Sequence, residues 1–289
     1  MREYLSLFRF RQYLKNLFIF LPLFFGLKLF NFDLLIEVLL TFIAFSLITS
    51  AVYIFNDYFD IEEDKLHPVK KNRSFASGKI PKSAAPFAIL ALLILGGSFL
   101  AIINLNAFWL ALGYLILNVS YTLKLKHVPI IDLLIISSGF VIRLFIGSVV
   151  ASVNLTDWIL IMTFLLSFFL ALAKRREDIL IYLETGVKTR KIIDGYNLDF
   201  LNAAMIIMAS VSIVSYIMYT ISPDAMYKAH SQWLYLTAIF VISGILRYLQ
   251  TTMVENGSGS PTNILLKDRF IQFAIIGWII TFGFLLYFL

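Results

Sequence analysis

Three aspartates that follow a long apolar segment are the residues of this chain best suited to chemistry. Asp57, Asp60 and Asp64 lie three and four residues apart, directly after the apolar run 34–55. On a helix that continues past this run, the spacing places the three carboxylates on one face. Such carboxylates repel one another unless a cation lies between them, and the acidic run contains neither Cys nor His. Because hard oxygen ligands favour magnesium, the pattern predicts a Mg²⁺ site that also binds a phosphate-bearing substrate.

Basic residues follow the acids in the same polar loop, which we place at residues 56–84. There are six of them, and Lys70, Lys71 and Arg73 are the candidates to bind phosphate. A metal that binds a diphosphate leaves further phosphate oxygens free, and Lys and Arg are suited to bind them. The alternative is a solvated loop whose acids and bases pair with one another. The regular spacing of the acids favours the phosphate-binding interpretation.

A second polar loop, residues 174–200, is also rich in basic residues. Lys174 and Asp178 are four residues apart, so a salt bridge within one helix is one explanation of the pattern. Positive charge that merely ends a membrane span is another. The functional interpretation is a second phosphate-binding site, since both loops leave the membrane on the same side. Its candidate ligands are Lys174, Arg175, Arg190 and Tyr196.

Composition indicates which elements must position these residues. Of the 289 residues, 60% are hydrophobic and 15% are charged, and the mean hydropathy is +0.86, which excludes an ordinary soluble domain. The absence of Cys excludes disulfides and Cys nucleophiles. The sequence predicts an all-α polytopic membrane protein, a bundle of about nine transmembrane helices that forms a single domain over residues 1–289. The predicted spans lie near residues 17–32, 34–55, 85–103, 107–123, 130–152, 157–173, 201–221, 233–250 and 270–289.

Positive charge sorts to one side of these spans. With the N-terminus in the cytoplasm, every Lys and Arg except Lys28, Lys228 and Arg143 falls in a cytoplasmic segment. The positive-inside rule therefore predicts that the N-terminus and both polar loops face the cytoplasm. We expect the protein to be integral to the plasma or inner membrane. The net charge of +6 lies in short loops between spans, which favours anionic lipid and phosphate-bearing substrates over nucleic acid. Whether the chain forms a homo-oligomer is left open.

Arg143 lies near the middle of the fifth predicted span. An arginine there costs roughly 2.5–3.5 kcal/mol on insertion scales and usually faces a bundle interior or a polar cavity. Asp132 is about 16 Å away along the helix axis, too far for a direct pair. We expect Arg143 to point into the cavity that the acids close; the alternative is an arginine held by backbone carbonyls between helices. Residues next to the ends of spans could reach a lipid headgroup. Gln12, Lys15 and Asn16 stand just before the first span, and Tyr121, Lys124 and Lys126 end the fourth span at the same depth.

The chain resembles the UbiA superfamily of intramembrane prenyltransferases. The residues that carry the resemblance are Asn56-Asp57-x-x-Asp60-x-x-x-Asp64, Asn72-Arg73, Gly78, Tyr121 with Lys124, and Arg143 with Gly147. The predicted span count agrees, so the resemblance covers nearly the whole chain. It implies a helical bundle around a central cavity open to the cytoplasmic side, with Mg²⁺ as cofactor.

Two departures from the family pattern bear on the substrate. Members usually carry a second aspartate-rich motif after the sixth span, which helps bind a prenyl diphosphate through magnesium. Here that position reads Lys174-Arg175-Arg176-Glu177-Asp178, and such cations favour direct contact with a phosphate. The lesser departure is Ser74, where the family usually has Pro, and it concerns only a local turn. The sequence is similar in this respect to the decaprenyl-phosphate phosphoribosyltransferase branch, and the residues that match it further are Arg190, Tyr196, Arg247-Tyr248 and Asp268-Arg269.

This resemblance implies transfer of 5-phosphoribose from phosphoribosyl diphosphate (PRPP) to a polyprenyl phosphate. Asp57, Asp60 and Asp64, with Asn56, would hold Mg²⁺ on the donor diphosphate. Lys70, Lys71 and Arg73 would bind donor phosphates, while Lys174, Arg175 and Arg190 would bind the 5-phosphate or the lipid phosphate. Arg143 and Lys15 would hold the lipid headgroup. Two alternatives remain: an enzyme that attaches an isoprenoid chain to an aromatic quinone or haem precursor, and a transporter for an anionic solute.

Overall fold

The computed structural model describes residues 6–186, 188, 191–255 and 261–288, and over these ranges its regular elements are all helices. The chain divides into two compact units. The first comprises Met1–Leu155 and Ile181–Gly195, and the second comprises Thr156–Leu180 and Tyr196–Leu289. The all-helical fold class predicted from the sequence is confirmed.

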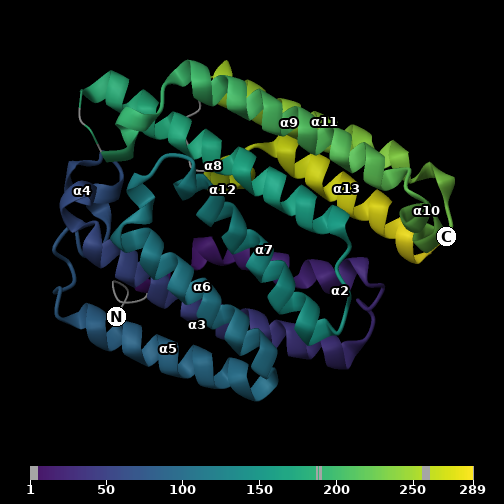
Figure 1. The fold of residues 1–289 in the computed structure, drawn as a ribbon, viewed down its shortest axis with the longest axis horizontal. Helices are drawn as coiled ribbons and strands as arrows, with labels where there is room; N and C mark the ends of the chain where they lie inside the picture. Colours follow the sequence, from purple (N-terminus) through teal and green to yellow (C-terminus); the bar gives the residue numbers. More distant parts are fainter. Residues whose placement is uncertain (1–5, 187, 189–190, 256–260, 289) are drawn as a thin grey trace. The chain divides into compact units, whose positions relative to one another are not determined.

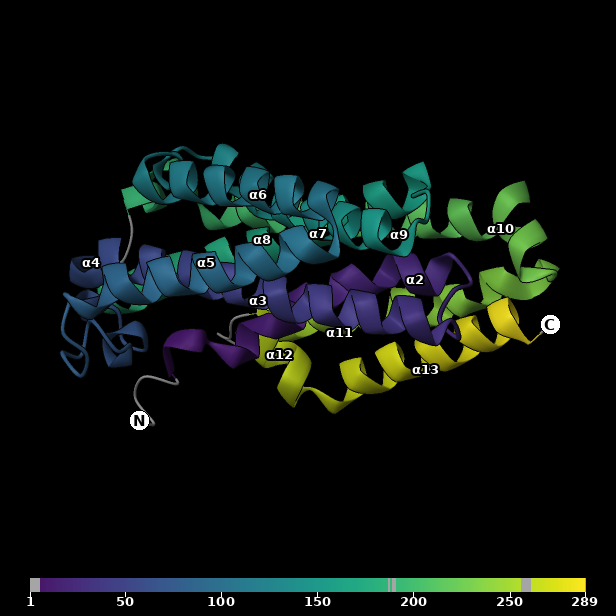
Figure 2. The ribbon, with the colours of Figure 1, turned by 90° about the horizontal axis from the view of Figure 1, so that it is seen from below.

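In the first unit, the long helix α3 (Phe32–Phe59) packs against three other long helices. These are α5 (Ala84–Ile103), α6 (Leu105–Leu123) and α7 (Ile131–Ala151). Helices α3 and α5 lie side by side in both views (Figures 1 and 2). The shorter elements of the unit are η1 (Ser6–Phe8), η2 (Phe10–Phe20), α2 (Leu21–Phe25), α4 (Ile61–Leu66), η3 (Lys70–Asn72), η4 (Leu125–His127) and η5 (Lys191–Gly195).

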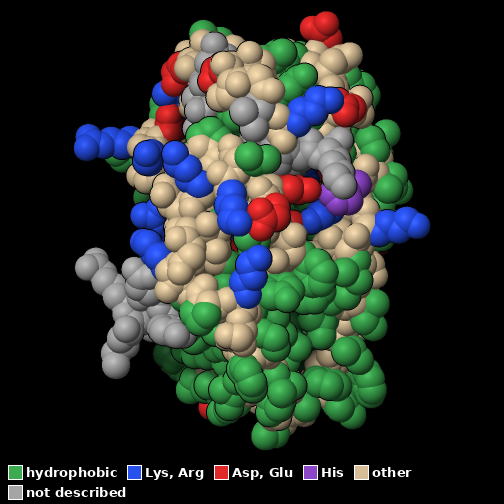
Figure 3. All heavy atoms as spheres, turned by 90° about the vertical axis from the view of Figure 1, so that its left-hand side faces the viewer, with side chains coloured by type: hydrophobic (Ala, Val, Ile, Leu, Met, Phe, Trp, Pro, Cys, Tyr) green, Lys and Arg blue, Asp and Glu red, His purple; other side chains and the backbone are tan. Residues whose placement is uncertain are grey.

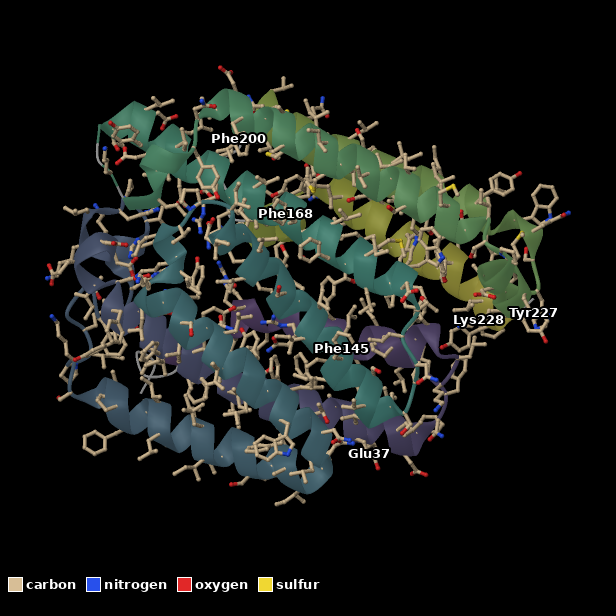
Figure 4. The ribbon with its side chains drawn as sticks, in the orientation of Figure 1. Glu37, Phe145, Phe168, Phe200, Tyr227 and Lys228 are labelled. Atoms are coloured by element: carbon tan, nitrogen blue, oxygen red, sulfur yellow. The ribbon has the colours of Figure 1, made fainter. Side chains whose placement is uncertain are left out.

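The second unit is also built from long apolar helices. Helix α11 (Ala238–Met253) packs against α9 (Leu198–Thr220) and α13 (Arg269–Tyr287). Figure 4 marks Tyr227 and Lys228 on the short helix α10, which follows α9. The remaining elements are α8 (Asp157–Thr185), whose last residues belong to the first unit, α10 (Pro223–Ala229), η6 (Gln232–Thr237) and α12 (Pro261–Lys267).

Eight helices within the described ranges are long and apolar enough to cross a membrane. They correspond to the second through ninth predicted spans. The first predicted span, 17–32, is not one of them: it contains the end of η2 and the five-residue helix α2. Pro22 lies at the start of α2, and after Gly26 the backbone of Leu27 turns into the left-handed region at φ 58°. Proline and this turn prevent one continuous helix.

The sixth span is longer than predicted. Helix α8 continues to Thr185, so the first residues of the predicted 174–200 loop, including Lys174 and Arg175, lie on a helix. In the first unit, helix α3 likewise extends beyond residue 55 and carries Asp57 in its last turn. At the opposite end of α3, Glu37 is exposed, one turn beyond the helix start (Figure 4).

Glycine allows the N-terminal segment to lie directly on α7. A Cβ atom at Gly147 would lie 2.0 Å from the backbone oxygen of Ile19, closer than any real contact. The backbone of η2 therefore touches the surface of α7, which places the neighbouring residues of η2 beside the polar side chains of that helix. Close backbone approach through small residues is common between membrane helices.

We expect Gly147→Ala to separate η2 from α7 and to lower the free energy of unfolding by about 1–3 kcal/mol, the usual cost of overpacking. The measurement is thermal unfolding of the purified protein in detergent. Gly113→Ala is the matched control, because Gly113 is exposed on α6 and an added Cβ would meet nothing within 4 Å. Equal melting temperatures for the Gly147 variant and the control would contradict the proposed contact.

Candidate functional site

The three aspartates lie at the junction between α3 and α4. Asp57 belongs to the last turn of α3, Asp60 is the residue between the two helices, and Asp64 lies on α4. Their exposed fractions are only 8%, 3% and 4%. The helix is thus interrupted at Asp60, yet the backbone N–H of Asp64 still donates to the carbonyl oxygen of Asp60 at 2.7 Å. Three buried carboxylates require cationic or hydrogen-bonding partners.

Two arginines hold Asp57 and Asp64. Arg9 donates from Nη2 to Oδ1 of Asp57 at 2.6 Å. Arg73 donates from Nη1 to the same oxygen at 3.0 Å and to Oδ2 of Asp64 at 2.7 Å, so it bridges the two carboxylates. Burial lowers the pKa of Arg9, while the negative charge of Asp57 acts in the opposite direction. These pairs connect the N-terminal segment and the loop after α4 to the acids.

Asp60 has a separate set of partners. The ammonium group of Lys126, on η4, forms a salt bridge with Oδ1, and both side chains are buried. The side-chain amide of Asn56 donates to Oδ2 at 2.8 Å. Thr122, at the end of α6, donates in turn to Oδ1 of Asn56 at 3.2 Å. Asp57, Asp60 and Asp64, which we call the acid cluster, are thus connected through Asp60 and Asn56 to the α6–η4 segment.

The donor atoms of the acid cluster are of the type that binds magnesium, but their arrangement does not form a preformed coordination site. Three buried carboxylates and an amide are the oxygen donors that Mg²⁺ prefers. Within the described ranges, however, no three acidic or His side chains are placed to share one metal ion. A divalent ion would compete with Arg9, Arg73 and Lys126 for the carboxylate oxygens they now bind.

Sequence reasoning counted Arg9 only as positive charge that orients the chain. It noted Lys126 as a residue at the end of the fourth predicted span, but did not select it as a site residue. Lys124, which was selected, is exposed, whereas Lys126 two residues later is buried against Asp60. The sequence shows that Lys124 and Lys126 both follow the end of the fourth predicted span. It does not show which of the two side chains is buried against Asp60.

The other selected residues of the first loop and span ends lie at the margin of the acid cluster. Lys70 is half-buried and Lys71 is exposed, both on η3, and Tyr121 is half-buried on α6. Figure 3 looks onto the end of the molecule that carries α4, where Lys and Arg side chains surround Asp and Glu side chains. Hydrophobic side chains fill the lower part of the same view (Figure 3).

Arg143 is buried inside the first unit and is only 3% exposed. Its Nε donates to Oδ1 of Asn16 at 2.9 Å, and its Nη1 donates to the carbonyl oxygen of Gly139 at 2.6 Å. Its Nη2 donates to the hydroxyl of Tyr114 at 3.1 Å. The guanidinium carbon also lies 4.9–5.5 Å from the ring centres of Tyr114, Phe140 and Phe45. Neutral dipoles and aromatic faces stabilise this cation.

No acidic side chain among the described residues forms a salt bridge with Arg143 or Lys15. Lys15, on η2, is half-buried next to Arg143. Burial, together with the positive charge of Arg143, lowers the pKa of Lys15 to about 8. Two neighbouring cations without a counter-charge favour the binding of an anion between them.

Of the remaining selected residues, Lys174, Arg175 and Tyr196 lie in the second unit. Arg175 is 1% exposed and donates from Nη1 to Oδ2 of Asp178 at 2.6 Å, so a salt bridge within α8 forms one residue away from the expected Lys174–Asp178 pair. Lys174 is half-buried on the same helix. Tyr196 is 9% exposed, and its ring stacks on that of Phe200. Arg190 lies outside the described residues.

Arg176, which sequence reasoning did not select, ties together three helices of the second unit. Its Nε donates to the side-chain oxygen of Asn202 on α9 at 2.8 Å. Its Nη1 donates to the carbonyl oxygen of Thr252 on α11 at 2.6 Å. This arginine therefore has a structural role within the unit.

Comparisons with known proteins agree with this architecture. The chain is 31% identical to a decaprenyl-phosphate phosphoribosyltransferase of Corynebacterium glutamicum over 273 residues, 93% of this chain and 82% of that protein. A protein of the same name from Mycolicibacterium smegmatis is 31% identical over 264 residues, 89% of this chain and 82% of that protein. The solved structure of a UbiA homolog from Archaeoglobus fulgidus bound to GPP and Mg²⁺ has a TM-score of 0.70 at 18% identity, and covers 99% of this chain and 100% of that one.

The family assignment follows from the length of the match. The model for the UbiA prenyltransferase family matches residues 18–273, which include the acid cluster, Arg143 and seven of the eight apolar helices in full. Apolar helices in this number make the chain an integral membrane protein. By fold and by sequence, it belongs to the UbiA prenyltransferase family.

Proposed function

We propose that this protein transfers 5-phosphoribose from PRPP to a polyprenyl phosphate, which yields polyprenyl-phosphoryl-5-phosphoribose and diphosphate. The observation that carries the proposal is the presence in one unit of two separate anion-binding features. One is the acid cluster with its cations, suited to a metal-bound diphosphate. The other is the two cations Lys15 and Arg143, which form no salt bridge with an acid among the described residues. A reaction between a diphosphate and a second phosphate needs both. The names of the relatives support the same reaction.

The acid cluster binds the donor in this proposal. Asp57, Asp60 and Asp64 would hold Mg²⁺, which when bound would neutralise negative charge on the diphosphate leaving group. Diphosphate oxygens give Arg9, Arg73 and Lys126 new partners in place of the carboxylates, with Lys70 and Lys71 available at the margin. Asn56 keeps the carboxylate of Asp60 oriented through its hydrogen bond. Charge-assisted hydrogen bonds from such groups strengthen as the leaving group gains charge.

Lys15 and Arg143 bind the phosphate of the lipid acceptor. An oxygen of this phosphate forms the new bond to C1 of the ribose, while the bond between C1 and the diphosphate oxygen breaks with its electron pair leaving on the diphosphate. The acceptor oxygen is already ionised near neutral pH, so no strong general base is needed. Arg143 is fixed in place by three hydrogen bonds, which is the rigidity expected of a group that orients a reactant.

The selected residues of the predicted 174–200 loop are further candidates. We assign Lys174, Arg175, Arg190 and Tyr196 to the 5-phosphate of the donor or to the acceptor phosphate. We place the acid cluster and both polar loops on the cytoplasmic side, because nearly all positive charge outside the spans lies in the segments on that side. The lipid acceptor enters from the bilayer, and PRPP is soluble.

The family description also favours a second function, the transfer of a prenyl chain from a prenyl diphosphate to an aromatic acceptor. The solved A. fulgidus relative was bound to GPP, a prenyl diphosphate. That reaction uses the acid cluster but needs no site for an acceptor phosphate. The Lys15–Arg143 pair therefore favours phosphoribosyl transfer over prenyl transfer.

Membranes containing the protein, Mg²⁺, labelled PRPP and polyprenyl phosphate should move label into the organic phase, and EDTA should stop the transfer. Asp57→Asn should reduce the rate by about 100-fold or more, because the diphosphate loses charge stabilisation. Glu62→Gln is the control, since Glu62 is exposed and pairs only with surface lysines among the described residues. Transfer from a labelled prenyl diphosphate, with none from PRPP, would establish the second function instead.

The affinity for the lipid acceptor should depend on pH through Lys15. Its ammonium is charged below a pKa of about 8, so the phosphate should bind tightly at pH 7 and more weakly as pH rises through 8 to 9. Arg at this position stays charged, so Lys15→Arg should lose this pH dependence, and Lys15→Met should bind weakly throughout. The measurement is KM for the acceptor at saturating PRPP from pH 7 to 9. Identical pH profiles for the wild type and Lys15→Arg would refute this role.

A further inference from the structure

Asn16 belongs to η2 in the N-terminal segment, and its side chain forms hydrogen bonds to two long helices. It is 1% exposed. Its Nδ2 donates to Oγ of Ser46 at 2.9 Å and to Oγ1 of Thr49 at 3.1 Å, both on α3. Its Oδ1 accepts from Nε of Arg143 on α7 at 2.9 Å. One neutral side chain thus links η2, α3 and Arg143.

The hydrogen-bond network determines which end of the amide faces the arginine. Thr49 already donates its hydroxyl hydrogen to the carbonyl oxygen of Ser46 at 3.0 Å, so it can only accept from Asn16. The NH₂ group must therefore face α3, and the amide oxygen must face Arg143. With Nη1 and Nη2 bound to Gly139 and Tyr114, the guanidinium plane has one orientation.

The neutrality of Asn16 matters as much as its geometry. An aspartate has nearly the same shape and its oxygen could accept the same hydrogen bond from Arg143. Its negative charge, however, would pair with the guanidinium in a buried setting and cancel the field that attracts an anion. The other partners of Arg143 are a carbonyl group, a phenol and aromatic rings, and all are neutral.

We propose that Asn16 is a positioning residue that orients Arg143 and, because it is uncharged, leaves the positive charge of Arg143 available to the acceptor phosphate. This inference rests on the proposed function for the identity of the anion. Asn16 itself makes no contact with substrate in this proposal, since its amide has no free donor or acceptor direction toward an anion. Its effect should appear in acceptor binding and leave donor binding unchanged.

Asn16→Asp tests the charge. We expect the variant to melt within a few degrees of the wild type, because the new ion pair with Arg143 replaces the lost amide bonds. Its affinity for polyprenyl phosphate should fall by about tenfold or more, a change that corresponds to about 1.4 kcal/mol. The KM for PRPP should stay within about twofold, since neither Asn16 nor Arg143 takes part in the ion pairs of the three aspartates. Binding of radiolabelled polyprenyl phosphate to the detergent-purified protein is measured without PRPP, so it does not depend on turnover.

Asn104→Asp is the matched control. It makes the same change of charge in the same unit, at the residue that caps α6, and aspartate caps helices as well as asparagine does. It should leave acceptor affinity unchanged. Asn16→Ala tests orientation without added charge and should raise the acceptor KM while the PRPP KM stays constant. If Asn16→Asp fails to fold, the acceptor KM of Asn16→Ala still tests the role of Asn16.

Two results would overturn the inference. One is wild-type acceptor affinity in a folded Asn16→Asp or Asn16→Ala variant. The other is a parallel loss of melting temperature, acceptor affinity and PRPP affinity, which is the signature of a purely structural residue. If the wild type binds polyprenyl phosphate but transfers no phosphoribose, the proposed function fails while the role of Asn16 is still decided by lipid binding.

Discussion

The cost of placing ionised groups inside an apolar bundle governs the arrangement of this protein. Asp57, Asp60 and Asp64 are almost fully buried, and each is paired with a cation. Those cations come from the N-terminal segment, from the loop after α4 and from η4. Because an unpaired buried carboxylate would cost several kcal/mol, the acids hold three otherwise separate segments in place. A substrate with a diphosphate would enter a site whose cations are already gathered.

Arg143 is the exception to this pairing. Its charge meets the amide of Asn16, a backbone carbonyl, the hydroxyl of Tyr114 and aromatic rings. These neutral partners satisfy its N–H groups but do not cancel its charge. An arrangement of this kind stabilises the protein less than an ion pair would, and it keeps an attractive field for an anion. Burial without neutralisation is therefore the physical signature of the proposed acceptor site.

In the second unit, the basic residues Lys174-Arg175-Arg176 on α8 include two arginines that hold the protein together. Arg175 pairs with Asp178 on the same helix, and Arg176 fastens α8 to α9 and α11. Part of the run that distinguishes this chain from the usual aspartate-rich motif is thus engaged in holding the unit together. In the function proposed above, a phosphate would compete with Asp178 for the guanidinium of Arg175.

Local patterns in the sequence determined the fold class, eight of the nine predicted spans and the clustering of the acids, because hydrophobic runs and helical spacing act over short distances. The first predicted span contains Pro22 and Gly26, and in the structure it is replaced by the end of η2 and the short helix α2. The partners of the buried charges were decided by tertiary structure alone. Arg9 and Asp57 are 48 residues apart, Lys126 and Asp60 are 66 apart, and Asn16 and Arg143 are 127 apart. Pairing at such separations depends on how whole helices pack, and sequence spacing contains no direct record of that packing.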